Sequence, residues 1–117
     1  MKVEQMTQQH QFVWNTLQLL EDGERIIGVD LQARAGIQDR RILYQIIKDL
    51  RQHNYLVGSS KTAGSGGYYV IKDEQDLNKT LSDLRNSAFS LLSTAKQIEM
   101  TFYKKHYGEL PLDFKDN

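Results

Sequence analysis

A chain of 117 residues has room for one domain of ordinary size with a short extension. Its 15 Lys and Arg balance its 15 Asp and Glu, so any attraction for nucleic acid or an anionic membrane must be local. The absence of Cys excludes disulfides, a thiolate zinc site and a cysteine nucleophile. The N-terminus resembles no signal peptide, and no stretch reaches the roughly 20 apolar residues of a membrane helix, so we expect a cytoplasmic protein.

Hydrophobic periodicity predicts two helices in the first third of the chain. Apolar residues recur at helical spacing over residues 7–22, and Gly23 follows as the expected stop. A very short helix is expected over residues 31–35, with Asp30 as its N-cap and Gly36 just past its end. Neither helix is long enough to be stable alone, so both require packing partners.

A third helix and a hairpin complete the expected domain. Residues 39–53 place five aliphatic side chains on one side of a helix: Ile42, Leu43, Ile46, Ile47 and Leu50. Residues 55–60 and 67–72 are rich in β formers and flank a loop of Gly, Ser, Thr and Ala, which predicts a hairpin with a flexible tip. The two isoleucines at 26–27 predict one more short extended segment.

A single long helix is expected over residues 74–107, which contain neither Gly nor Pro, with Asp73 as its cap. Apolar residues follow one another at alternating spacings of four and three: Leu77, Leu81, Leu84, Ala88, Leu91, Ala95, Ile98 and Phe102. Such a heptad seam is typical of helices that pair, which predicts a homodimer. The alternative is a helix packed entirely on Trp14 and the first helix of its own chain.

This element order is that of a winged helix-turn-helix domain, so the predicted fold class is mainly α with a small β-hairpin, α+β, followed by a long C-terminal helix. The expected organisation is a tail over 1–6, the winged helix-turn-helix domain over 7–73, a dimerisation helix over 74–107 and a tail over 108–117.

Several segments also carry a family resemblance. They are Gly36-Ile37, Arg40-Arg41-Ile42, Asn54 to Ser60, Gly67 to Val70, Leu81 to Ala88 and Leu91 to Ala95. Together they resemble small winged-helix proteins encoded by phages and prophages of Gram-positive bacteria. The resemblance covers about residues 23–102 and implies double-stranded DNA binding, in transcriptional regulation or as a replication accessory factor. Two departures are Gln32, where a small Ala is usual, and Gln38, where a Ser or Thr usually caps the second helix.

The chemistry of the third helix fits a major groove. Opposite its aliphatic side, Arg41, Tyr44, Gln45 and Lys48 recur at positions i, i+3, i+4 and i+7. Arg pairs bidentately with guanine and Gln with adenine, while Lys and Tyr reach phosphate and sugar oxygens. The expected DNA-binding residues are Gln38, Arg40, Arg41, Tyr44, Gln45, Lys48, Arg51 and Lys61.

Local charge agrees with this prediction, because residues 29–61 hold six basic and three acidic residues, a net charge of +3. Lys61 and the Ser and Thr residues of the loop are expected to follow a phosphate strand or enter a minor groove.

Two alternatives to DNA binding remain open from the sequence. The polar side of the third helix is equally typical of a solvated surface, and the neutral chain with one Lys in its wing also suits a protein-protein interaction module that does not bind DNA.

His10, His53 and His106 lie in different elements without Cys or carboxylate at ligand spacing, so no metal and no cofactor is expected. No catalytic grouping of Ser, His and Asp is evident, which predicts that the chain is not an enzyme.

Overall fold

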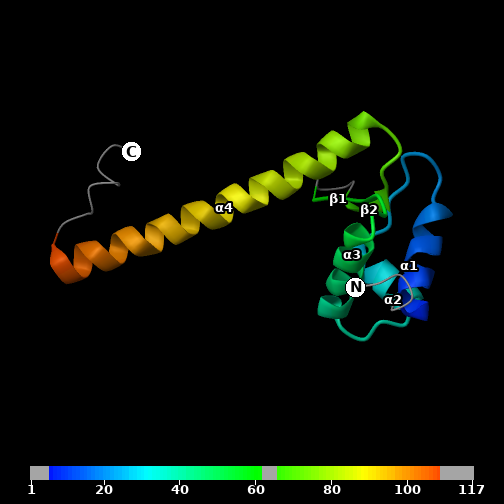
Figure 1. The fold of residues 1–117 in the computed structure, drawn as a ribbon, viewed down its shortest axis with the longest axis horizontal. Helices are drawn as coiled ribbons and strands as arrows, with labels where there is room; N and C mark the ends of the chain where they lie inside the picture. The colour runs from blue at the N-terminus through cyan, green and yellow to red at the C-terminus, as the bar shows by residue number, and fades with distance from the viewer. Residues whose placement is uncertain (1–5, 62–65, 109–117) are drawn as a thin grey trace. The chain divides into compact units, whose positions relative to one another are not determined.

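The computed structural model describes residues 6–61 and 66–108, and it is mainly helical with one β-hairpin (Figure 1). The helices and strands follow in the order α1 Gln8–Gln18, α2 Gly28–Arg34, α3 Arg40–Gln52, β1 Val57–Ser60, β2 Gly67–Val70 and α4 Glu74–Tyr107. This confirms the predicted α+β class, with three short helices beside a hairpin and a long helix at the end of the chain. The expected tails, over residues 1–6 and 108–117, lie almost wholly outside the described residues.

The sheet has the connectivity of a winged helix-turn-helix domain. β1 and β2 are antiparallel, with Val57 opposite Val70 and Ser60 opposite Gly67. Ile26, between α1 and α2, forms a two-way bridge with Tyr68 of β2, the backbone N–H of each donating to the carbonyl of the other at 3.1 and 2.8 Å. The predicted extended segment at 26–27 therefore forms a single bridge to β2. This bridge occupies the place of the first strand of a winged helix-turn-helix domain.

α1 begins where expected but ends four residues early. Thr7 caps it, since its hydroxyl accepts a hydrogen bond from the His10 N–H, and the His10 ring accepts one from the Thr7 N–H at 3.1 Å. The predicted continuation to residue 22 is wrong, because residues 21–24 form a turn. In this turn the N–H of Glu21 donates to the Glu24 carboxylate and the N–H of Glu24 donates to the Glu21 carbonyl. Gly23, at φ +81°, supplies the positive φ of that turn and does not end the helix.

α2 begins at Gly28, three residues before the predicted start, with Ile27 at the N-cap. Asp30 is therefore not the cap but an acidic residue in the first turn, where it faces the positive end of the helix dipole. The end of α2 is as predicted. Gly36 adopts φ +65°, and the N–H of Ile37 donates to the carbonyl of Gln32, which closes a Schellman motif.

α3 is bounded by a side-chain cap and by an unusual backbone conformation. The Asp39 carboxylate accepts a hydrogen bond from the N–H of Arg41 at 2.9 Å, so Asp39 and not Gln38 is the N-cap. At the other end Asn54 adopts φ +70°, and the N–H of Tyr55 donates to the carbonyl of Leu50. Asn is one of the few residues with a side chain that tolerate this conformation.

Replacing Asn54 with Ala should therefore lower the free energy of unfolding by about 1 kcal/mol, because the Cβ of Ala is disfavoured at positive φ. Asn54→Gly, the matched control, should be as stable as the natural protein or slightly more so. Chemical denaturation followed by circular dichroism measures both. Equal stability of the Ala and Gly variants would contradict a strained C-cap.

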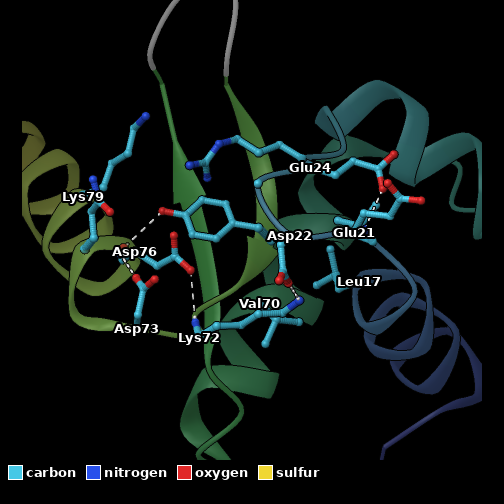
Figure 2. A pocket seen from close by; sticks show the side chains of 14 residues that line it. Leu17, Glu21, Asp22, Glu24, Val70, Lys72, Asp73, Asp76 and Lys79 are labelled. Atoms are coloured by element: carbon cyan, nitrogen blue, oxygen red, sulfur yellow. Dashed lines mark hydrogen bonds and ion pairs between the residues drawn. The ribbon is translucent and has the colours of Figure 1, made fainter.

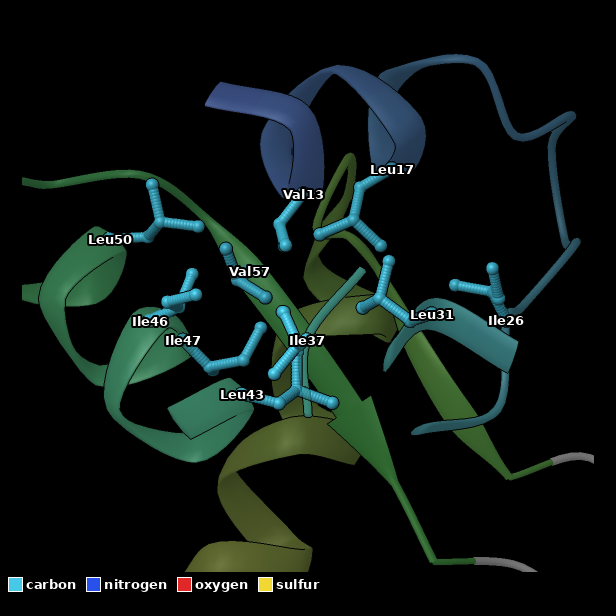
Figure 3. Close-up of a cluster of buried hydrophobic side chains, with 10 residues drawn as sticks. All are labelled: Val13, Leu17, Ile26, Leu31, Ile37, Leu43, Ile46, Ile47, Leu50 and Val57. Carbon is cyan, nitrogen blue, oxygen red and sulfur yellow. The ribbon is translucent and has the colours of Figure 1, made fainter. Parts of the chain in front are cut away.

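The core lies between α1, α2, α3 and β1 (Figure 3). Its buried members are Val13, Leu17, Ile26, Leu31, Ile37, Leu43, Ile46, Ile47, Leu50 and Val57. Ile42, expected on the buried side of α3, is instead 45 % exposed. At 100° per residue it lies about a quarter turn from the centre of the buried stripe, so it reaches only the edge of the core.

α4 is a continuous helix of 34 residues, and its predicted bounds are confirmed. Asp73 caps it by accepting a hydrogen bond from the N–H of Asp76 at 2.8 Å. The chain nevertheless divides within this helix, into compact units over residues 1–83 and 84–117, rather than at the predicted boundary after residue 73. Among the described residues no helix combines the length and the apolar character needed to cross a membrane.

The first turns of α4 belong to the N-terminal unit because they cover one face of the hairpin. The Thr80 hydroxyl is 2.7 Å from the hydroxyl of buried Tyr69 and accepts a hydrogen bond from the N–H of Ser59. The Asp83 carboxylate accepts one from the N–H of Lys61 at 3.0 Å. These contacts leave the opposite face of the hairpin to pack on α3.

Candidate nucleic-acid interface

The polar side of α3 is exposed, as the sequence predicts. Arg41, Tyr44, Gln45 and Lys48 all lie at the protein surface, whereas Leu43 and Leu50 on the other side of the helix are fully buried. Tyr44 keeps 54 % of its surface exposed. Gln38, two residues before the helix, is also exposed. Five of the eight predicted DNA-binding residues therefore form one accessible surface at and before the start of α3 and along its outer side.

Arg41 is held in place by the helix cap. Its guanidinium donates to the Asp39 carboxylate at 2.9 Å, and its side chain is 88 % exposed. Hydrogen bonds from the Arg41 guanidinium and backbone N–H lower the pKa of Asp39, so this carboxylate remains ionised. Solvent screening makes such an exposed pair weak, and a phosphate or a guanine can compete with Asp39 for the guanidinium.

Gln45 is hydrogen-bonded to Asp49, which is also in hydrogen-bond contact with buried His10. Its side-chain amide donates to one oxygen of Asp49 at 2.8 Å, and the ring of His10 is 2.9 Å from the other. Asp49 and His10 are both buried, although they are separated by 39 residues in the chain. Burial alone would raise the pKa of Asp49, but the hydrogen bonds from His10 and Gln45 outweigh it and hold this pKa below its usual value.

The predicted roles of Arg51 and Arg40 are only partly compatible with the structure. Arg51 donates to the carbonyl of Val57 at 2.9 Å and to the Ser59 hydroxyl at 3.1 Å, and burial lowers its pKa. Arg51 therefore connects α3 to β1 by hydrogen bonds and is not an exposed phosphate ligand. Arg40 is half-buried and donates to the side chain of Gln32 at 3.0 Å. Gln32 thus links α2 to α3 by a hydrogen bond.

Tyr68 was not predicted as part of this surface. It is half-buried on β2, next to residues of α3, and its ring carbon Cε2 approaches Gly28 together with the Arg40 guanidinium. Burial raises the pKa of Tyr68 and the neighbouring Tyr44 raises it further, whereas Arg51 and Arg40 lower it. The alternation of side chains along a strand could have predicted the position of Tyr68. Because Tyr69 faces α4, Tyr68 must face the other way.

The predicted wing is only partly described. Lys61 is exposed at the end of β1, and its backbone N–H is bound by Asp83. Thr62 and Ser65, which we expected to contact a phosphate strand, lie outside the described residues. The role of the wing in DNA contact remains a prediction.

A pocket of about 410 Å³ lies elsewhere in the N-terminal unit, near the start of α4 (Figure 2). Several of its charged groups take part in specific interactions. Lys72 forms an ion pair with Asp22 at 2.7 Å, and its backbone N–H donates to Asp76. The Arg25 guanidinium lies 3.9 Å from the centre of the Tyr69 ring, a cation-π arrangement. These interactions connect residues 22–25, which precede α2, to β2 and to the segment that leads into α4.

The three histidines have separate surroundings. His10 belongs to the cap of α1 and contacts Asp49, His53 is the C-cap residue of α3, and the His106 ring stacks on Phe102 with 4.2 Å between ring centres. Within residues 6–61 and 66–108, no cluster of three or more His, Asp or Glu has the arrangement of a metal site. The Thr7 hydroxyl, 2.8 Å from the His10 ring, serves as the helix cap.

Comparison with known proteins gives no significant match to a family model, to a curated protein or to a solved structure. What supports a function for this chain is therefore its fold and the surface chemistry of the residues described above.

Proposed function

We propose that this protein binds double-stranded DNA through the exposed side of α3. The observation that carries the proposal is the outward projection of Arg41, Tyr44 and Lys48 from a helix whose opposite side is anchored in the core. In helix-turn-helix proteins a helix with this anchoring enters the major groove, and its exposed side chains reach base edges and phosphates.

The exposed charges of α3 support the proposal, because they are more positive than the sequence of the helix alone indicates. Asp49 is the only acidic residue within α3, and it is buried against His10. The accessible charges of the helix are therefore positive, with Arg41 and Lys48 exposed and Arg40 half-exposed. A cationic surface of this kind attracts the phosphate backbone and releases its condensed counterions.

Dimerisation through α4 is the second part of the proposal. Side chains of the heptad seam in the C-terminal unit are exposed, with Leu84 at 46 %, Leu91 at 72 % and Ile98 at 66 %. A row of exposed aliphatic side chains is costly in water and is removed from it when a second helix packs against the row. Two linked copies of α3 bind DNA more tightly than one, because the second contact becomes intramolecular.

The biological role follows the family resemblance. In the role of a phage-type transcriptional regulator or of a replication accessory factor, a dimer would recognise two DNA half-sites. The competing function is a protein-protein interaction module. It is favoured by the pairing of Arg41 with Asp39, which places a carboxylate beside the N-terminus of α3 where it would repel phosphate.

The test is duplex binding measured by fluorescence anisotropy over a salt series. Arg41→Ala and Lys48→Ala should each weaken binding by about tenfold at moderate salt. Each should also reduce the slope of log K against log salt concentration by about one if the lost contact is to phosphate. The far-ultraviolet circular dichroism of both variants should be unchanged, since both side chains are exposed.

Lys104→Ala is the matched control, because it removes an exposed Lys from the end of α4 and leaves α3 intact. It should bind as the natural protein does. Natural protein that fails to bind any duplex at low salt would favour the protein-interaction module. Equal losses in Lys104→Ala and Lys48→Ala would contradict a specific role for α3.

A further inference from the structure

We infer that the α4 helices of two copies pair antiparallel, in one register centred near Leu92 and Ser93. The inference deepens the homodimer part of the proposed function and depends on it. It uses only side chains of the C-terminal unit, from Leu84 to Phe102. All of the residues that it places in contact are exposed in the single chain.

The sizes of the side chains in the seam favour antiparallel pairing, and the residues that flank the seam select the register. The positions of the seam alternate between two series along the helix: Leu84, Leu91 and Ile98 in one, and Ala88, Ala95 and Phe102 in the other. In an antiparallel pair, members of one series face members of the other. One register places Ala88 opposite Ile98 of the second copy and Ala95 opposite Leu91 of the second copy. Each alanine then faces a large side chain, and Phe102 faces Leu84 of the second copy, so no layer consists of two alanines.

The parallel arrangement lacks this complementarity. In a parallel, in-register pair each residue faces its own copy, so Ala88 would face Ala88 and Ala95 would face Ala95. Layers of two alanines between layers of large residues leave unfilled space, and such cavities cost stability. The seam therefore favours the antiparallel pair.

The residues flanking the seam agree with the same register. Arg85, Leu92 and Glu99 each follow a seam residue and recur every seven positions. In the antiparallel register, residues of this row meet across the dimer axis. Leu92 then contacts Leu92 of the second copy. Arg85 of each copy faces Glu99 of the other, which gives two equivalent pairs. Leu92 is 67 % exposed in the single chain, and this contact would bury it.

A parallel pair offers these three residues no such partners. The row on the other side of the seam holds Ser87, Thr94 and Thr101, all uncharged. In parallel helices Arg85 and Glu99 would face members of that row or Thr80, and Leu92 would face Ser87. Charge complementarity and apolar contact thus select the same direction of pairing as side-chain size does.

The first experiment is a charge exchange, read as the dimer dissociation constant by analytical ultracentrifugation. Arg85→Glu places a second carboxylate opposite Glu99 twice in each dimer, and should raise the dissociation constant about tenfold at low salt. Glu99→Arg should do the same. The double variant Arg85→Glu/Glu99→Arg regains both pairs and should return to within about twofold of the natural protein. A double variant as weak as the single variants, or single variants without effect, would overturn the register.

The second experiment measures distances between spin labels by pulsed electron resonance. The chain has no Cys, so Ser90→Cys and Lys104→Cys give single labels on the same outer side of α4. In the antiparallel register the two labels at 90 are offset by about 9 Å along the axis and those at 104 by about 33 Å, at 1.5 Å per residue. The distance at 104 should exceed the distance at 90 by about 15 Å or more. Equal distances at the two positions would demonstrate a parallel pair and overturn the inference.

These readouts separate the inference from DNA binding. A natural protein that is monomeric at micromolar concentration would overturn both the dimer and its register, even if α3 binds DNA. A dimer with the expected distances that binds no DNA would support the register and contradict the role of α3.

Discussion

Replacing Gly58 with Val is expected to leave most of the N-terminal unit unfolded at 25 °C. Gly58 lies in β1 directly against the ring of Tyr69, and a Cβ at this position would be 2.8 Å from the ring carbon Cζ and 2.9 Å from the Thr80 hydroxyl oxygen. Neither neighbour can move without breaking the buried hydrogen bond between Tyr69 and Thr80. Overpacking with loss of that bond should cost about 3 kcal/mol or more.

A loss of this size is comparable to the whole stability that a core of this size provides. Thermal unfolding followed by circular dichroism should show a much lower midpoint for Gly58→Val and an intermediate one for Gly58→Ala. The compensating variant Gly58→Ala/Tyr69→Leu should be more stable than the sum of its single changes predicts, because the smaller side chain vacates the space. Strict additivity would show that the Cβ does not meet the Tyr69 ring.

Replacing Asp49 with Ala should reduce the free energy of unfolding by about 2 kcal/mol at pH 7. The change leaves the buried His10 ring nitrogen without its partner and frees the side chain of Gln45. Asp49→Asn is the matched control, since its carbonyl oxygen can still accept from His10 while its volume is almost unchanged. Denaturant titration should place the Asn variant close to the natural protein.

The Asp49 carboxylate should also make the stability of the protein depend on pH. The pKa of Asp49 in the folded protein lies below its ordinary value of 3.8, so its contribution is fully present above about pH 4 and disappears as the pH falls through the folded pKa. Stability measured from pH 6 down to pH 2 should therefore decline less in Asp49→Asn than in the natural protein. An identical decline in both would exclude Asp49 as a contributor.

Local signals in the sequence were sufficient for most helices and strands. Asp73 caps α4 and Gly36 follows the end of α2 as predicted, and the absence of Gly and Pro from residues 74–107 correctly predicted the full length of α4. Each of these features depends on residues within one or two helical turns, so a short window of sequence contains the cause. The exposed side of α3 was predictable for the same reason, because a strongly amphipathic helix has only one side to bury.

The missed polar contacts involve groups that only the folded structure brings together. His10 and Asp49 give no local sign of pairing, and only the packing of α1 on α3 brings them together. Arg51 has the composition of a phosphate ligand, but the neighbouring hairpin offers its guanidinium a carbonyl and a hydroxyl at closer range. The boundary between the two units lies within α4 because Thr80 and Asp83 bind the hairpin. The sequence by itself thus determined which helices and strands form, in which order, and which side of α3 faces water. Only the tertiary structure decided which polar side chains remain free for a ligand, because hydrogen-bond partners are assigned by proximity in space.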